Sequence, residues 1–395
     1  MCLAETLSMT GFAAYPAFLA LLRDTWGLSN SEAGFIGGAY FAGYMTAVPF
    51  LSSLTDRIDA RRIYIGSCLL AAFSNLGFAI LAQGVLPAAL FQAMAGAGLA
   101  GTYMPGLKAL TDRVAGPGQS RYISFYTATF AIGSSVSLLL AGWLGSLMDW
   151  RSVFGLLSFG PLNAALLFAF GLKPLPPPAA KAEFKVIRHI GIVLRERSLL
   201  FFFFGYTVHC WELLGLRAWM VAFLLFAYEL QQPAQPPFSA TTAAAAIGLL
   251  GLASSICGNE MAGRFGRHKY ITAVMAISGA MAWATGLSVT WPCWLMLLML
   301  ALYFMTIMAD SAALTAGLMA VAPLNQRGAA MAVYSLLGFG AGFIAPLVFG
   351  VVLDLAGGTS DSNAWSVAVG SLGLGCLIAS VPAYFKHRHR PGLTS

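Results

Sequence analysis

Apolar residues run along the chain in long blocks that short polar segments separate. The blocks cover residues 1–22, 33–54, 63–82, 88–110, 122–148, 152–172, 199–226, 241–263, 270–290, 292–320, 329–354 and 364–385. A helix needs about 20 apolar residues to cross the roughly 30 Å hydrocarbon core of a bilayer, so each block approaches or reaches the length of a transmembrane helix. The pattern predicts an all-α membrane protein with twelve transmembrane helices.

The composition excludes a soluble protein. Hydrophobic residues make up 58% of the chain and charged residues 9%, whereas a soluble domain is about 25% charged. The six cysteines are scattered without paired spacing, which predicts neither a disulfide framework nor a metal site. The net charge of +7 arises from basic residues between the apolar blocks rather than on one face, so we expect no nucleic-acid partner.

The basic residues also orient the predicted helices. Lys108 and Arg217 lie inside predicted helices. If the twelve helices alternate in direction, all other Lys and Arg residues fall on one side of the membrane except Arg23 and Arg151. Because Lys and Arg are retained in the cytoplasm, both termini are predicted to be cytoplasmic. The compact loops suit a bacterial inner membrane.

The longest polar stretch divides the chain into two halves. Residues 173–198 begin with a run of prolines and are predicted to link a bundle of six helices at 1–172 to a second at 199–395. The middle of this linker is expected to form a short amphipathic helix on the inner membrane surface.

An internal repeat supports this division. Arg57 and Arg264 follow the second and eighth blocks and lie 207 residues apart, as do Glu5 and Glu212. A duplicated design of this kind predicts a substrate site near the midplane, between the halves. Glu5 has far fewer residues before it than Glu212 has in its block. We therefore expect that the natural chain begins upstream of Met1.

Two loop motifs carry a family resemblance. The segment SSLTDRIDARR, Ser52 to Arg62, resembles the loop signature G-x-x-x-D-R-x-G-R-R of the major facilitator superfamily, with Ser52 and Asp59 where glycines are usual. A second copy, RFGR from Arg264 to Arg267, has Gly263 in place of the acid. The resemblance implies two six-helix bundles that transport by alternating access. It also implies that the first, fourth, seventh and tenth spans line the cavity.

In that family a loop acid and an arginine at the end of the fourth span form part of a cytoplasmic gate. The resemblance therefore gives the gating candidates, which are Asp56, Arg57, Arg61, Arg113, Glu260, Arg264 and Arg267. The alternative is that these charges only fix the topology. The glycine-rich antiporter signature of the family is not recognisable at 131–138, which counts against drug/proton antiport.

Ionisable residues within the predicted spans are few. Each costs about 2.5–3.5 kcal/mol to insert at the bilayer centre, which makes each a candidate for function. They are Glu5, Lys108, His209, Glu212, Arg217, Glu260 and Asp310. Lys108 precedes Asp112 by four residues, so an i,i+4 ion pair accounts for it.

The seventh span concentrates these residues. Arginine suits a carboxylate or a similar oxyanion, and a buried carboxyl group suits proton exchange. We predict that Arg217 binds an anionic substrate while Glu212, with His209 or Asp310, gains and loses the coupling proton. Glu5 is a further candidate for substrate or proton binding. The alternative is a structural Glu–Arg network with the ligand elsewhere.

The predicted function is proton-coupled transport of a small organic or inorganic anion. Efflux of amphipathic cations is the second hypothesis, because three acidic residues outnumber Arg217 at depth. A non-transporting sensor on the same scaffold is the third. No metal-ligand cluster or nucleotide-binding loop is present in the sequence, so we expect neither an enzyme nor a primary pump, no cofactor and no metal. The expected partners are a small molecule, protons and lipid, with the protein a monomer.

Overall fold

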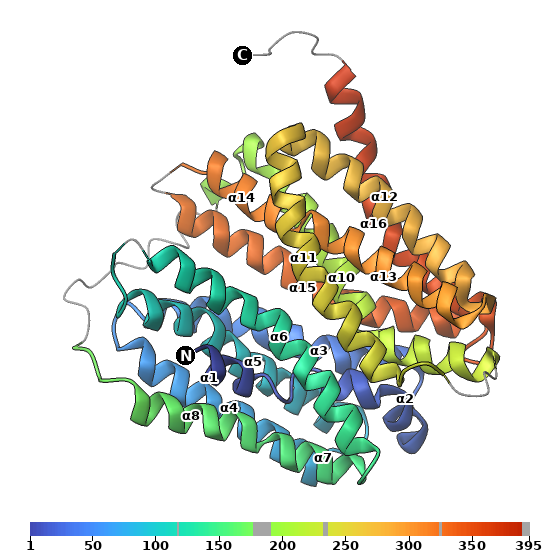
Figure 1. The fold of residues 1–395 in the computed structure, drawn as a ribbon, viewed down its shortest axis with the longest axis horizontal. Coiled ribbons are helices and arrows are strands. Elements are labelled where there is room, and N and C mark those ends of the chain that lie inside the picture. The colour runs from blue at the N-terminus through green and yellow to red at the C-terminus, as the bar shows by residue number, and fades with distance from the viewer. Residues whose placement is uncertain (117, 177–190, 232–235, 324–325, 389–395) are drawn as a thin grey trace. The chain divides into compact units, whose positions relative to one another are not determined.

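The computed structural model describes residues 1–116, 118–176, 191–231, 236–323 and 326–388. Within these residues the regular structure is helical and includes no strand (Figure 1). Eleven of the described segments are helical, long and apolar enough to cross a membrane. The chain is thus an all-α membrane protein, as the apolar blocks predict.

The first half of the chain forms eight helices. They are α1 (Cys2–Ser8), α2 (Ala14–Trp26), α3 (Asn30–Leu54), α4 (Ala60–Leu81), α5 (Val85–Thr111), α6 (Gln119–Gly145), α7 (Trp150–Leu157) and α8 (Phe159–Gly171). Helix α4 packs against α5, α7 and α8, and α1 packs against α8 and α6.

Among its described residues, the second half forms seven α-helices and a short 3₁₀ helix. They are α10 (Arg197–Gln231), α11 (Ala240–Phe265), α12 (Arg267–Leu287), the 3₁₀ helix Ser288–Thr290, α13 (Cys293–Ala309), α14 (Ser311–Val321), α15 (Arg327–Leu355) and α16 (Ser362–Arg388). Helix α12 packs against α16 and α13, and α10 packs against α15 and α16.

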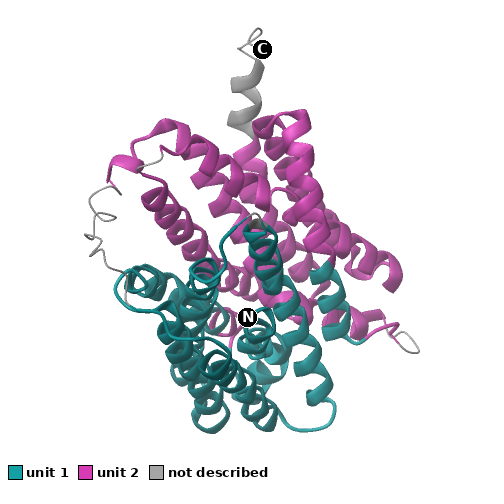
Figure 2. Cartoon of the chain, turned by 60° about the vertical axis from the view of Figure 1, so that its left-hand side comes forward, with its two compact units in different colours: residues 1–28, 35–185, 239–249 teal, residues 29–34, 186–238, 250–395 magenta. Residues whose placement is uncertain are grey.

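The chain divides into two compact units (Figure 2). Unit 1 consists of Met1–Leu28, Phe35–Lys185 and Ser239–Leu249, and unit 2 of Ser29–Gly34, Val186–Phe238 and Leu250–Ser395. The linker predicted at 173–198, and the domain boundaries derived from it, stay predictions. The amphipathic helix expected in its middle falls on residues 177–190, which lie outside the described residues.

The predicted first span, residues 1–22, is two helices rather than one. Helix α1 ends at Ser8 and α2 begins at Ala14. Ser137 on α6 satisfies backbone groups at the break, because the Ala13 N–H donates to its Oγ at 2.9 Å and that Oγ donates to the Thr10 carbonyl at 2.6 Å. A helix can break at membrane depth only where another group replaces its lost hydrogen bonds.

Glycines allow α3 and α5 to meet backbone to backbone. A Cβ atom on Gly43 would clash with the carbonyl oxygen of Ala93, and one on Gly96 would clash with the carbonyl oxygen of Tyr40. Small residues at such crossings permit the close approach on which helix association in membranes depends.

Replacement of Gly96 by alanine is therefore expected to destabilise the protein by about 1–3 kcal/mol, the usual cost of overpacking a tight contact. Gly66 on α4 is the matched control, because a Cβ there would meet no atom within 4 Å. Gly66→Ala should be neutral or stabilising by about 0.5–1 kcal/mol. Thermal unfolding in detergent measures both variants, and equal midpoints would contradict the packing.

Candidate functional site

Two acidic side chains and a histidine lie buried among the described residues of unit 2. His209 and Glu212 on α10 and Asp310 at the junction of α13 and α14 are 2%, 1% and 3% exposed. The Nδ1 atom of His209 lies 2.8 Å from Oδ1 of Asp310. Isolated buried charges are costly, so a partner within ion-pair distance matters, although this contact lacks the geometry of an ordinary hydrogen bond. The arrangement brings two of the predicted proton-exchanging groups into direct contact.

Asp310 lies at a break in the tenth predicted span. The pattern predicts one helix at 292–320, but α13 ends at Ala309 and α14 begins at Ser311. The Asp310 carbonyl accepts the N–H of Leu314 at 2.8 Å. The carboxyl group thus lies where α13 ends and α14 begins, and the backbone of Asp310 itself stays in the right-handed helical region. The predicted span is retained, because Cys293–Val321 is long and apolar enough to cross a membrane, and the structure adds an interruption at Asp310.

Glu212 joins α10 to two further helices. Its Oε2 accepts hydrogen bonds from Ser278 Oγ on α12 at 2.8 Å and from Cys376 Sγ on α16 at 3.1 Å. The Tyr303 hydroxyl on α13 lies beside the same carboxyl group, and neither it nor Glu212 Oε1 makes a hydrogen bond of ordinary geometry with a described residue. One carboxyl oxygen is therefore anchored while the other remains available to a proton.

Arg217 lies on the same helix, five residues after Glu212. Its guanidinium carbon is 5.5 Å from the centre of the Phe304 ring on α13. Contact of this kind with an aromatic face helps to hold a guanidinium group in place. The rise of a helix separates Arg217 from Glu212 by about 7.5 Å along its axis.

Glu5 is a buried carboxyl group of unit 1. It is 0% exposed, and its Oε2 accepts a hydrogen bond from the Tyr126 hydroxyl on α6 at 2.9 Å. The Tyr64 hydroxyl on α4 lies beside it without ordinary hydrogen-bond geometry, as Tyr303 lies beside Glu212. The predicted substrate and proton residues are thus four in unit 2 and one in unit 1.

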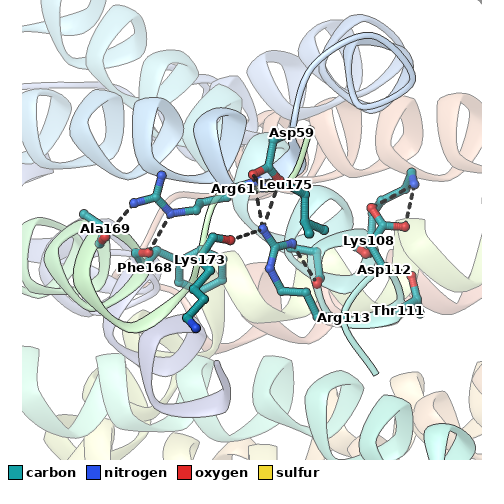
Figure 3. A network of polar contacts seen from close by, with 11 residues as sticks. Asp59, Arg61, Lys108, Thr111, Asp112, Arg113, Phe168, Ala169, Lys173 and Leu175 are labelled. Carbon is teal, nitrogen blue, oxygen red and sulfur yellow. Dashed lines mark hydrogen bonds and ion pairs between the residues drawn. The ribbon is translucent and has the colours of Figure 1, made fainter. Parts of the chain in front are cut away.

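A second polar network connects the ends of α4, α5 and α8 in unit 1 (Figure 3). Asp59 is its centre, because both carboxylate oxygens lie 3.1 Å from Nη2 of Arg113 and Oδ2 also accepts the N–H of Leu175 at 2.9 Å. The same Arg113 nitrogen donates to the Lys173 carbonyl at 3.0 Å. The residues that follow α8 are therefore tied to the loop before α4.

Arg61 belongs to the same region. Its Nε and Nη2 atoms donate to the carbonyls of Phe168 and Ala169 at 3.1 and 2.5 Å (Figure 3). These carbonyls are in the last turn of α8, where the helix dipole favours a cation. Lys108 and Asp112 form the predicted i,i+4 ion pair at 2.8 Å.

The gating role of all seven candidates, Arg61 and Arg113 included, stays a prediction. Arg267 Nη1 donates to Asn259 Oδ1 at 3.0 Å and to the Ala313 carbonyl at 2.8 Å. Three of the candidates have exposed side chains, namely Arg57, Glu260 and Arg264. Asp56 is partly buried in the turn after α3.

Asp59 was not among the predicted functional residues, although it makes more contacts than Asp56. The sequence shows it only as an acid in a position where the family motif has glycine. A usable signal was its place directly before α4, since Asp is a preferred N-cap, and its carboxylate indeed accepts the Arg61 N–H at 3.0 Å. The residues around Glu5 and Glu212, namely Tyr126, Ser278 and Cys376, carry no comparable local signal.

Burial of Asp59 acts to raise its pKa. The hydrogen bonds from Leu175, Arg61 and Arg113 outweigh that effect and hold the pKa below its ordinary value. A lowered folded-state pKa means that the carboxylate stabilises the fold above the ordinary pKa of about 3.9, and that this contribution is lost as the pH falls through the folded-state pKa.

Asp59→Asn should therefore unfold at a lower temperature than the parent at neutral pH, because it loses a charged partner for Arg113 while an Asn can still cap α4. The difference should shrink as the pH falls below about 4. Melting curves across a pH series measure it, with Asp112→Asn as the exposed control. A difference between parent and variant that does not change with pH would contradict the assignment.

These features define a polytopic helical membrane protein with buried acid–base groups. Its similarity to known proteins gives its family. Residues 1–346 match the profile of the Major Facilitator Superfamily. The chain belongs to this superfamily, whose members are membrane transporters.

Solved structures show the same fold at low sequence identity. A bacterial homolog of the human lysosomal transporter Spinster, in an inward-facing and occupied conformation, aligns with a TM-score of 0.78 and 14% identity over 98% of this chain and 96% of that one. The nucleoside transporter NupG aligns with a TM-score of 0.73 and 14% identity over 97% and 98%.

Curated relatives are matched over shorter stretches. A multidrug resistance protein B homolog of Mycobacterium tuberculosis is 29% identical over 42% of this chain and 30% of its own length. The 3-(3-hydroxy-phenyl)propionate transporter of Escherichia coli is 30% identical over 34% and 32%. The gentisate transporter of Corynebacterium glutamicum is 29% identical over 40% and 36%. The matched stretches span about a third of the length of each relative.

Proposed function

We propose that this protein is a secondary transporter that moves a small organic anion together with protons by alternating access. The observation that carries the proposal is the burial of His209, Glu212 and Asp310 within one unit, with Arg217 on the same helix as two of them. Ionisable groups at membrane depth are expensive and are kept where a substrate or proton needs them.

The proton-exchanging part is the pair of buried acidic groups with His209. The 2.8 Å contact between His209 and Asp310 allows a proton to move between them without a large displacement. Glu212 holds one oxygen against Ser278 and Cys376, so its second oxygen takes up and releases a proton while the side chain keeps its position.

The anion-binding part is Arg217. A guanidinium group presents donors in a fork that matches a carboxylate, and it stays charged throughout the physiological pH range. Two curated relatives are named as transporters of aromatic acids, which supports a carboxylate that carries an aromatic ring as the substrate. The Phe304 ring beneath the guanidinium provides an apolar surface that suits the aromatic ring of such a substrate.

Reconstitution in liposomes tests this function. Vesicles with a trapped pH dye would receive gentisate, 3-(3-hydroxyphenyl)propionate, small aliphatic carboxylates, inorganic anions and lipophilic cations in turn. Proton entry that depends on an aromatic or aliphatic carboxylate would support the proposal. Proton movement with cations alone would overturn it in favour of efflux, which the named multidrug relative keeps as the second hypothesis.

We also propose that the protein acts as a monomer in a bacterial inner membrane with both termini in the cytoplasm. The support is the placement of nearly all Lys and Arg residues in alternate loops. A tag at the carboxyl terminus should resist protease in intact cells and be cleaved after lysis. Cleavage in intact cells would reverse the orientation.

A further inference from the structure

Tyr126 in unit 1 has one hydroxyl hydrogen for two neighbouring oxygen atoms. Its hydroxyl oxygen lies 2.9 Å from Glu5 Oε2 and 3.2 Å from the main-chain carbonyl oxygen of Thr102. A carbonyl oxygen only accepts, and so does an ionised carboxylate, while a phenol has one hydrogen to donate. If Glu5 were ionised, the single hydrogen of the phenol would have to be shared between both acceptors in a three-centre bond, which weakens each contact.

A protonated Glu5 satisfies both contacts. The carboxyl O–H then donates to the Tyr126 oxygen, and the Tyr126 hydroxyl donates to the Thr102 carbonyl. The result is a continuous chain of donors from α1 through α6 to α5, and each oxygen in it has a partner of the correct kind.

The surroundings of Glu5 favour the same state. The titratable groups that interact electrostatically with it are hydroxyls and a thiol on α3, α4, α5 and α6, namely Tyr40, Tyr44, Tyr64, Cys68, Tyr103 and Tyr126. Helix α8, which also packs against α1, has no titratable residue. Among these groups none is a cation, and a buried carboxylate without a cationic partner is strongly disfavoured.

Gly106 leaves room for this arrangement. A Cβ atom on Gly106 of α5 would clash with the Tyr126 hydroxyl oxygen, so the absence of a side chain allows the phenol to reach Glu5.

We propose that Glu5 is a second proton-binding site of the transport cycle, held protonated by Tyr126 and distinct from the site at Glu212. When Tyr126 and Thr102 separate during the cycle, the carboxyl O–H bond breaks and its proton passes to water. Tyr126 then donates its own hydrogen to the carboxylate. The transport consequence rests on the proposed function, whereas the protonated state of Glu5 does not.

Infrared spectroscopy of the full chain in lipid vesicles tests the protonated state. At neutral pH the parent should show the C=O stretch of a protonated carboxyl group, shifted on exchange into D₂O. Glu5→Gln should lose this band, and Glu32→Gln, which changes an exposed glutamate, should keep it. A parent without the band, or a band that is unchanged in Glu5→Gln, would overturn the proposal.

Tyr126→Phe tests the same infrared band in a variant that keeps Glu5, so the test does not depend on whether Glu5→Gln folds. Removal of the phenol oxygen deprives the carboxyl O–H of its acceptor, so the band should move to higher frequency, and Gly106→Ala should move it by displacing the same hydroxyl. An unmoved band in both variants would contradict the chain of donors.

The proton-to-anion ratio separates this proposal from the proposed function. Glu5→Gln should lower the ratio by half in liposomes while Glu32→Gln leaves it unchanged. A lost band together with an unchanged ratio would overturn the transport role of Glu5 and leave the proposed function standing. Absence of coupling in the parent would overturn the proposed function, and the infrared band would still decide the state of Glu5.

Discussion

Glu212→Gln is expected to lower proton-driven anion uptake by about half or more, to the level that a second proton site at Glu5 sustains. The amide oxygen of glutamine still accepts hydrogen bonds from Ser278 and Cys376, so the packing around it should survive. The amide neither takes up nor releases a proton in the working pH range. Exchange of labelled for unlabelled anion, which needs no net proton movement, should therefore persist. The ratio of exchange to proton-driven uptake in reconstituted vesicles measures the effect.

Glu229→Gln is the matched control for this variant. Glu229 lies on the same helix and has the same side chain, but it is exposed near the end of α10. Its replacement should leave uptake and exchange at parental levels. Parental proton coupling in Glu212→Gln would exclude Glu212 as a proton carrier and leave His209, Asp310 and Glu5 for that role.

Arg217→Ala is expected to weaken anion binding by about 10- to 100-fold. A hydrogen bond to a charged group contributes about 1.5–3 kcal/mol, and each 1.4 kcal/mol corresponds to about tenfold in affinity. The apparent affinity for the anion should fall far more than the maximal rate, since the proton-exchanging groups remain. Initial rates of uptake across a range of anion concentrations measure both quantities.

Two further variants limit the interpretation of that result. Arg217→Lys keeps the charge but loses the fork, so it should recover part of the affinity. Arg197→Ala removes an exposed arginine from the first turn of the same helix and should bind as the parent does. Equal affinity in Arg217→Ala and the parent would remove Arg217 from the anion site.

The length and spacing of the apolar blocks are enough to predict most of the fold. In a bilayer each helix must satisfy its own backbone hydrogen bonds, so a block of apolar residues has few alternatives to a spanning helix. The described helices follow these blocks from α3 to α16, and the loop motifs from Ser52 to Arg62 and from Arg264 to Arg267 led to the family that the comparisons show.

The interruptions in the spans could not be predicted from the blocks. The break between α1 and α2 depends on Ser137, more than a hundred residues away, which supplies a donor and an acceptor to the free backbone groups. The break at Asp310 lies in a stretch that is apolar on both sides. The local sequence does not indicate which distant side chain will form hydrogen bonds with the free backbone groups at a helix break.

The buried charges show the same division. The sequence by itself determined that Glu5, His209, Glu212, Arg217 and Asp310 are costly at membrane depth, because that cost depends only on residue type and on the apolar block around it. The tertiary structure decided which partners they meet: Asp310 for His209, Ser278 and Cys376 for Glu212, and Tyr126 for Glu5. It also made Asp59 rather than Asp56 the partner of Arg113. Such pairings arise from the packing of helices far apart in the chain, and ordinary serine, cysteine and tyrosine residues give no local sign of them.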